Sequence, residues 1–363
     1  MAHPLSGADL STLTGVFRDG GHPDRWAQAA GIWGSALGRL PFTLAEHALI
    51  ARHLPPPDPP PVFILGHWRS GTTHLYNVMS LGHWSYVPPV ATGLPWDMLM
   101  LGRLLRPFLE RQLPETRFID NIPVTPTSPQ EDEIALANMS RLSFYHGIYF
   151  PRRFDQLIDR GLFFDGCTET EIEAWSARFR YFLSKIAHQQ GKPLLIKNPT
   201  YTARPAMLKR IFPGAKFIHI HRNPLDVFMS MRNFYKKLLA ELALQTPPTG
   251  LDLDATILRV YRRMMMAFEA ETTGWEAPDF VELPYDLLDR QPMAALERVY
   301  GDLALDGFSA AEPHFCRYLD EVRSFEKNKF APDMDAVRKT AAALGPWIER
   351  WGYDLPDTSK GAP

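Results

Sequence analysis

The chain has 363 residues, of which 45% are hydrophobic and 22% are charged, as is ordinary for a soluble globular protein. Its net charge of −2 argues against a nucleic-acid binder driven by overall charge. Cys167 and Cys316 are too few for a disulfide framework or a CxxC metal site, and no signal-peptide pattern is present, so a cytoplasmic location is expected. No apolar run reaches about 18 residues, so no integral membrane segment is predicted.

Three parts are predicted along the chain. Residues 1–54 form a helical N-terminal segment. Residues 55–61 form a proline-rich spacer, because such a run of prolines fits neither a helix nor a central strand. The remainder, 62–355, is predicted as an α/β domain with a helical insertion at about 84–190.

The stretch 98–113 shows an amphipathic helical pattern that includes several arginines, and Pro107 should kink or divide it. One interpretation is a core-facing helix with a solvated face. The other is a lid over a hydrophobic acceptor, or a helix that lies on a membrane surface.

The most informative stretch is an apolar strand, 62–65, followed by a glycine-flanked loop and a helix that starts near Ser70 or Gly71. Helix N-termini with free N–H groups attract anions. From Gly66 onward the spacing matches the P-loop pattern G-x-x-x-x-G-K-[ST], except that Thr72 stands in place of the lysine.

Further strands and helices alternate after this loop. Strands are predicted at 193–197, 216–221 and 280–283, and helices at 169–190, 255–270, 293–304 and 335–350, with further helices after Asn198-Pro199 and after an Asn223 N-cap. Ser128 and Pro129 predict the start of another helix. This order predicts a P-loop-like parallel sheet with helices on both faces, whose ligands bind at the carboxyl ends of the strands.

Three groups are expected along that edge: the loop with Arg69, the strand end at Lys197, and Arg222 with Ser230 eight residues later. The missing lysine and the lack of a clear Walker-B aspartate disfavour ATP with magnesium, and no GxGxxG motif supports a dinucleotide. Two separated anion sites suit a nucleotide with phosphates at two positions of its ribose.

These residues resemble the sulfotransferase family, which uses 3′-phosphoadenosine 5′-phosphosulfate (PAPS) as donor and releases phosphoadenosine phosphate (PAP). The loop 69–73 resembles its 5′-phosphosulfate site, and Arg222 with Ser230 resembles its 3′-phosphate site. The stretches 195–224 and 128–133 are typical of the bacterial branch, and the resemblance covers about residues 60–240. The resemblance implies that two sets of residues hold the donor. The loop supplies Arg69, Ser70, Gly71, Thr72 and Thr73, and the second set is Arg222 and Ser230.

Two departures from the cytosolic branch of the family stand out. That branch has lysine where this chain has Arg69, which is shared with the tyrosine-protein branch. It also has a histidine base in a Lys-x-His arrangement, whereas Lys197 is followed by Asn198-Pro199. The family's glycine-rich C-terminal nucleotide segment is not evident, and Lys327 is the weak substitute.

Catalysis of sulfonate transfer needs charge stabilisation and a base. Arg69 and Lys197 are the candidates for the first, although Lys197 could simply pair with an acid. Glu131 and Glu133 are the candidates for the base, although acids here could instead complement a helix dipole. Lesser candidates for the base are His67, His74 and His146.

The sequence therefore predicts a metal-independent sulfotransferase that acts on a hydroxyl, with an amine as the second choice. Apolar residues suggest a small-molecule or lipid acceptor rather than a sugar, with no nucleic-acid partner: Trp96, Met98, Phe144, Tyr145, Tyr149 and Phe150. The alternatives are an ATP-dependent P-loop kinase and a nucleotide-binding protein without catalysis.

Overall fold

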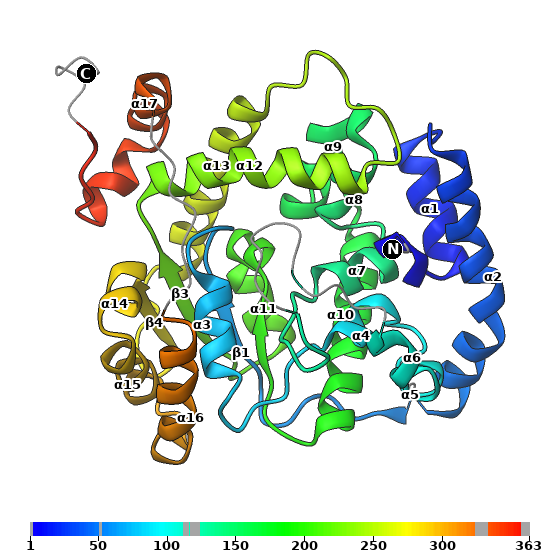
Figure 1. The fold of residues 1–363 in the computed structure, drawn as a ribbon, viewed down its shortest axis with the longest axis horizontal. Helices are drawn as coiled ribbons and strands as arrows, with labels where there is room; N and C mark the ends of the chain where they lie inside the picture. The colour runs from blue at the N-terminus through cyan, green and yellow to red at the C-terminus, as the bar shows by residue number, and fades with distance from the viewer. Residues whose placement is uncertain (1–2, 51–52, 112–115, 117–123, 324–332, 357–363) are drawn as a thin grey trace.

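The structure is a computed structural model, and it describes residues 3–50, 53–111, 116, 124–323 and 333–356. Within these residues four parallel strands form one sheet in the order β2-β1-β3-β4 (Figure 1). The strands are β1 (Val62–Leu65), β2 (Leu195–Lys197), β3 (Lys216–His221) and β4 (Phe280–Pro284). All four correspond to predicted strands, and β2 is shorter than predicted.

Side chains alternate between the two faces of the sheet, as the pleat of a strand requires. Phe63 and Leu65 pack with one cluster, which is covered by α10 (Glu169–Gln190) and α11 (Pro205–Ile211). Val62 and Ile64 pack on the opposite face, which is covered by α3 (Thr72–Met79), α15 (Pro292–Asp302) and α16 (Phe308–Glu321). The predicted fold class is thus confirmed, although α16 was not predicted.

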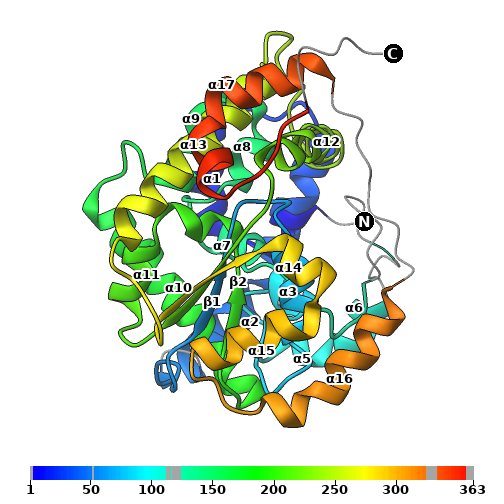
Figure 2. The same cartoon turned by 90° about the vertical axis from the view of Figure 1, so that its left-hand side faces the viewer.

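A group of helices lies above the sheet in both views (Figures 1 and 2). They share one hydrophobic cluster, and they are α8 (Tyr145–Tyr149), α9 (Phe154–Phe163), α12 (Pro224–Leu242), α13 (Leu253–Thr272) and α17 (Met334–Arg350). Asn223 caps α12 as predicted, because its Oδ1 accepts from the Leu225 N–H at 3.0 Å. This group is the helical cap.

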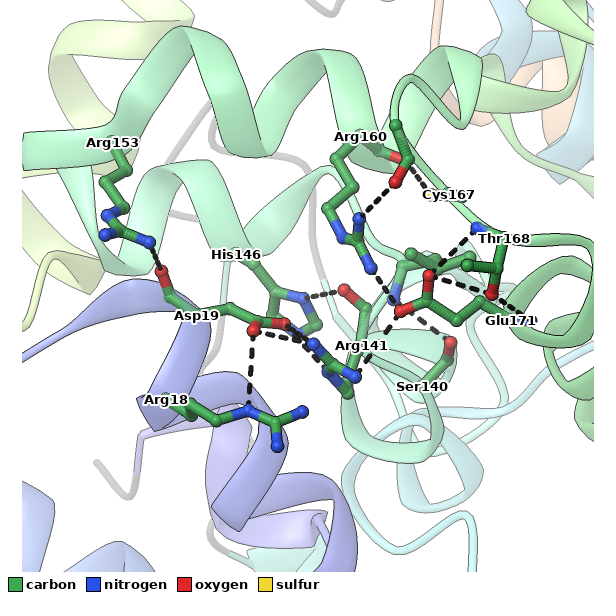
Figure 3. A network of polar contacts seen from close by, with 12 residues as sticks. Arg18, Asp19, Ser140, Arg141, His146, Arg153, Arg160, Cys167, Thr168 and Glu171 are labelled. Carbon is green, nitrogen blue, oxygen red and sulfur yellow. Dashed lines mark hydrogen bonds and ion pairs between the residues drawn. The ribbon is translucent and has the colours of Figure 1, made fainter.

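The N-terminal segment packs against the cap and the insertion through η1 (Pro4–Gly7), α1 (Leu10–Gly20) and α2 (Trp26–Leu49). Figure 3 shows the polar contacts that attach α1. Arg141 makes two hydrogen bonds to Asp19, at 2.8 and 2.6 Å, and lies 3.4 Å from Glu171 of α10. Glu171 also pairs with Arg160 of α9, so one network joins three helices.

Pro107 divides the predicted helix 98–113, as expected. The structure has two short helices there, α5 (Leu101–Leu104) and α6 (Arg106–Arg111). The break falls at Leu105, and Pro107 is the second residue of α6. The other short elements are α4 (Pro89–Gly93), α7 (Glu133–Met139), η3 (Pro151–Arg153), η4 (Pro199–Ala203) and α14 (Tyr285–Arg290).

The predicted helix start at Ser128 is wrong. The Ser128 hydroxyl accepts from the Thr125 N–H at 2.8 Å, so it closes a turn and caps nothing further along the chain. The Gln130 N–H donates to the Val87 carbonyl at 2.8 Å, and α7 begins only at Glu133. Glu131 therefore lies before the helix and Glu133 lies at its first position, which separates the two acids.

Candidate active site

The loop between β1 and α3 has a backbone that requires its glycines. Gly66 has φ 142° and Gly71 has φ 100°, in the region that side chains rarely adopt. A Cβ at Gly66 would lie 2.4 Å from the Ile220 carbonyl oxygen, and one at Gly71 would lie 2.3 Å from the Tyr285 ring. Arg69 also has a positive φ, 69°, which is uncommon outside glycine and is typical of functional loops.

The loop has the features of an anion cradle. It ends at the N-terminus of α3, where main-chain N–H groups and the helix dipole favour negative charge. The Ser70 hydroxyl is buried, and within the described part of the chain it has no hydrogen-bond partner. Because a buried polar group without a partner is costly, this hydroxyl fits a ligand oxygen. Thr72 is buried and Thr73 is half-buried at the first two positions of the helix.

Lys197, Glu131 and Thr73 meet beside this loop. Lys197 ends β2, which pairs with β1, and its side chain is 2% exposed. Its Nζ lies 2.5 Å from Glu131 Oε1 and 3.2 Å from Thr73 Oγ1. Lys197 therefore pairs with an acid, and it also donates to the first turn of α3. The Glu131 side chain is 16% exposed and so retains contact with solvent.

Glu133 lies in a sealed network instead. It is 1% exposed, and its Oε1 accepts from Ser143 Oγ and the Phe144 N–H at 2.7 and 3.0 Å. Its Oε2 accepts from Asn198 Nδ2 and Thr200 Oγ1 at 2.9 and 3.1 Å. All of these partners are neutral donors of the protein. Both oxygens are thus occupied, and the geometry no longer supports Glu133 as a base.

Asp132 belongs to the same network. It is fully buried and accepts from Asn198 Nδ2 at 2.9 Å and from the Tyr201 hydroxyl. Burial raises the pKa of Asp132 to about 7, with the nearby Glu133 charge acting in the same direction. The Asp132 carboxyl group thus joins the start of α7 to Asn198 and Tyr201, which follow β2.

Arg69 joins the loop to the cap. Its Nε donates to Ser230 Oγ at 2.8 Å, and Ser230 lies two turns into α12. The two residues that the sequence placed in separate anion sites are thus in direct contact. A ligand that reaches one of them is also close to the other.

The aromatic ring of Tyr285 contacts both Arg222 and the loop. Its guanidinium carbon lies 4.8 Å from the centre of the Tyr285 ring, and its Nη2 pairs with Asp226 Oδ2 at 3.1 Å. The same ring lies against Gly71, where a Cβ would meet it at 2.3 Å. Tyr285 therefore lies between the loop and Arg222, and it connects the two predicted donor sites.

The lesser candidates for the base are buried or half-buried histidines. His67 is buried with Nδ1 3.0 Å from the Trp68 carbonyl oxygen, and burial lowers its pKa to about 4. The ring nitrogens of His146 lie 3.2 and 3.0 Å from main-chain carbonyl oxygens, and His74 is half-buried on α3. Lys327 lies outside the described residues. In the part of the chain that the structure describes, no cluster of three His, Cys, Asp or Glu side chains could hold a metal ion.

The aromatic side chains offered for an acceptor pocket are packed in the core. Phe144, Tyr145, Tyr149 and Phe150 are buried in the cap cluster, and Trp68 packs on Phe144 with ring centres 4.6 Å apart. Met98 and Trp96 belong to the cluster on the face of α10. Their packing gives no support for an acceptor pocket.

Sequence reasoning missed two residues that contact the loop. Thr202 of η4 accepts from the Gly66 N–H at 2.8 Å and so anchors the start of the loop, and Tyr285 covers Gly71. Tyr285 follows β4 directly and Thr202 follows β2 by five residues. Their positions after strand ends, where parallel sheets bind ligands, were the signal that could have found them.

Comparison with known proteins shows the family of the chain. Residues 60–309 match the model described as the sulfotransferase family. The chain belongs to the sulfotransferase family. It is 31% identical over 301 residues to omega-hydroxy-beta-dihydromenaquinone-9 sulfotransferase Stf3 of Mycobacterium bovis, and the match covers 81% of this chain and 76% of the relative. The protein of the same name from Mycobacterium tuberculosis matches equally.

Solved sulfotransferase structures share the fold. STF9 from Mycobacterium avium superposes with a TM-score of 0.68 at 16% identity, covering 96% of this chain and 98% of that one. STF1 from Mycobacterium tuberculosis superposes with a TM-score of 0.59 at 14% identity, covering 93% and 91%. At identities this low, the likeness to these two structures shows a shared fold alone.

Proposed function

We propose that this sulfotransferase moves a sulfonate group from PAPS to a hydroxyl group of an apolar small molecule or lipid, with an amine as the second choice. The observation that carries the proposal is the loop 66–71 with a contact set on each side. One side has Arg69 with Ser230, and the other has Thr73, Lys197 and Glu131. A donor anion held in the loop would thus lie beside both a cation and a carboxylate.

The donor site uses two sets of residues in this proposal. The 5′-phosphosulfate would be held by loop and helix-start donors, namely Ser70, Gly71, Thr72 and Thr73. The 3′-phosphate would be held by Arg222 and Ser230, whose connection to the loop runs through Tyr285 and Arg69. Lys327 stays a predicted donor contact. Charge-assisted hydrogen bonds from an arginine guanidinium group, as proposed for Arg222, are typical of phosphate recognition.

The chemistry assigned to these residues is an in-line displacement. The acceptor oxygen forms a bond to sulfur, its proton passes to the Glu131 carboxylate, and the bond from sulfur to the bridging oxygen breaks as PAP leaves. Lys197 and Arg69 would stabilise the charge that develops on the bridging and sulfonate oxygens. Magnesium has no role in this scheme.

The choice of acceptor rests on the relatives. The name of Stf3 gives its acceptor as a hydroxylated dihydromenaquinone, and its sequence is 31% identical to this chain. We infer an apolar acceptor with a hydroxyl group for this sulfotransferase as well. The cytoplasmic location and the absence of a nucleic-acid partner stay predictions.

The deciding experiment titrates the purified protein with PAP and with ATP–magnesium, and then measures the transfer of labelled sulfonate from PAPS to a panel of acceptors. The proposal predicts PAP binding and turnover with apolar alcohols. ATP–magnesium binding without a response to PAP would indicate a kinase. PAP binding without turnover on any acceptor would indicate a binding protein.

Two variants test the donor site. Arg222→Ala should weaken PAP binding at least tenfold, since it removes a charge-assisted contact. Arg298→Ala is its matched control, because Arg298 makes the same i,i+4 pair, with Asp302 at 3.2 Å, on α15. Arg69→Ala should lower kcat more than it lowers PAP affinity. Unchanged PAP affinity in Arg222→Ala would refute the 3′-phosphate assignment.

A further inference from the structure

The long helix α2 has its charges inside and its apolar side chains outside. Its charged residues, Arg39 and Glu46, are buried: Arg39 makes two 3.0 Å hydrogen bonds to Asp97, and Glu46 pairs with Lys185. The outward side of α2 is formed by large apolar side chains that are 37% to 71% exposed, namely Trp26, Leu37, Phe42, Leu44 and Leu49. A surface helix of a soluble protein normally shows the opposite pattern.

The segment that holds α5 and α6 extends this apolar side. Glu46 of α2 accepts hydrogen bonds from the Leu99 and Met100 N–H groups at 2.9 and 2.8 Å, so the start of α5 lies against α2 (Figure 1). Further along this segment, apolar side chains are 36% to 69% exposed, namely Leu104, Leu105 and Phe108. The arginines between and beside them are exposed as well, namely Arg103, Arg106 and Arg111.

These side chains are concentrated on two adjoining segments of the chain. Ten large apolar residues are exposed in the residues that the structure describes, and eight of them lie on α2 or at 104–108. The other two are Leu81 and Met266. We call the eight residues the apolar face. Exposed large apolar side chains concentrated in this way indicate a binding surface, whereas single exposed apolar residues need no explanation.

We propose that the apolar face docks the protein on a lipid bilayer that contains anionic lipids. Apolar side chains beside arginines are the composition of a helix that lies in a membrane interface, where the cations contact anionic headgroups. Over its 24 residues α2 is about 36 Å long, which suits a helix lying flat. None of the helices among the described residues is long and apolar enough to cross a bilayer.

Charge favours a bilayer over a second copy of the chain. A symmetric pair would need acids on the apolar face to match Arg103 and Arg111. The exposed side of α2 offers none, and Glu110 of α6 is already bonded to Arg106 at 2.6 Å. Anionic headgroups supply the missing charge. The proposal rests on this surface and not on the proposed sulfonate transfer, although a lipid acceptor would be reached from such a position.

The test is co-sedimentation of the full chain with vesicles of phosphatidylcholine, with and without phosphatidylglycerol. The protein should bind the anionic vesicles more tightly, and added salt should weaken this binding. Leu37→Glu and Leu104→Glu should each lower vesicle affinity at least tenfold, since each removes a leucine that the bilayer would bury and adds a charge. Arg103→Gln should lower affinity about fivefold, for anionic vesicles alone.

Met266→Glu is the matched control, because Met266 is 53% exposed on α13 outside the apolar face. It should bind vesicles as the unaltered protein does, and thermal melts should show that all variants fold. Transfer to a short water-soluble acceptor should be unchanged in Leu37→Glu, which separates docking from catalysis.

Three outcomes would overturn the proposal. The first is a protein that binds neither kind of vesicle. The second is a dimer in solution that Leu37→Glu dissociates while the unaltered protein ignores vesicles, which would assign the face to a second copy. The third is an equal loss of binding in Met266→Glu and Leu37→Glu, which would make the interaction nonspecific.

Discussion

Two carboxylates that are two residues apart in the sequence lie in opposite environments. Glu131 is partly exposed and contacts the Lys197 ammonium group at 2.5 Å, next to the loop. Glu133 is sealed and accepts four hydrogen bonds from neutral donors. An acid that must exchange a proton with a second molecule needs access to it. The Glu131 side chain reaches solvent, and that of Glu133 does not.

The difference shows how one short segment serves both chemistry and structure. Because α7 begins at Glu133, the acid before the helix projects toward β2, while the acids at the helix start hold Asn198 and the chain beyond it. Asn198 follows Lys197 directly, so the sealed network also fixes the strand end that carries the candidate ammonium group. We expect substitutions at the two acids to affect different measurements.

The largest expected effect is on the rate of Glu131→Gln. Loss of the proposed base should lower kcat by about 10²- to 10⁴-fold. Glu269→Gln is the control, since Glu269 forms a similar partly exposed ion pair with Arg350, at 2.7 Å, far along the chain. Steady-state kinetics with PAPS decide the point. Full activity in Glu131→Gln would remove this residue from the mechanism.

Lys197→Met should lower kcat by about 10²- to 10³-fold, because it removes a cation beside the developing charge while keeping the shape of the side chain. PAP affinity should change much less than kcat. The check is PAP titration together with single-turnover kinetics. If both quantities fall in parallel, Lys197 binds the donor equally in the ground state and the transition state, and its proposed role is wrong.

Glu133→Gln should affect stability instead of rate. Either orientation of the new amide places its NH₂ against two donors, Ser143 with Phe144 or Asn198 with Thr200. The expected loss is about 1–3 kcal/mol in the free energy of unfolding, measured by urea titration. The kcat per folded molecule should stay within a few-fold of the original. A lost kcat at unchanged stability would reverse the assignment of the two acids.

The sequence predicted the sheet and the loop because their signals are local. Apolar runs bounded by proline or glycine mark the strands, and the spacing of Gly66 and Gly71 follows from backbone angles that only glycine adopts readily. The choice between Glu131 and Glu133 could not be predicted. It depends on a turn closed by Ser128 and on donors more than 60 residues away, such as Asn198.

Distant partners also decided which side of a helix is buried. Leu37 and Leu44 of α2 point outward, while Arg39 and Glu46 on the same helix have buried partners. Similarly, the contact of Arg69 with Ser230 joins residues 161 positions apart, and the sequence placed them in separate sites. Local patterns thus predict elements, whereas long-range polar contacts set the site.

The smallest expected effect is a change in pH dependence in Asp132→Asn. Burial raises the pKa of Asp132 from 3.8 to about 7 on folding, so between these values the folded state binds more protons. The free energy of unfolding of the original protein should therefore fall as pH rises through this window. Asparagine does not titrate, and its amide can replace the protonated acid between Asn198 and Tyr201. The stability of the variant relative to the original should rise from about pH 4 to about pH 7 and then level off, which urea titrations across that range would detect. A constant difference would mean that Asp132 stays ionised in the folded protein and that the sealed network holds a charge.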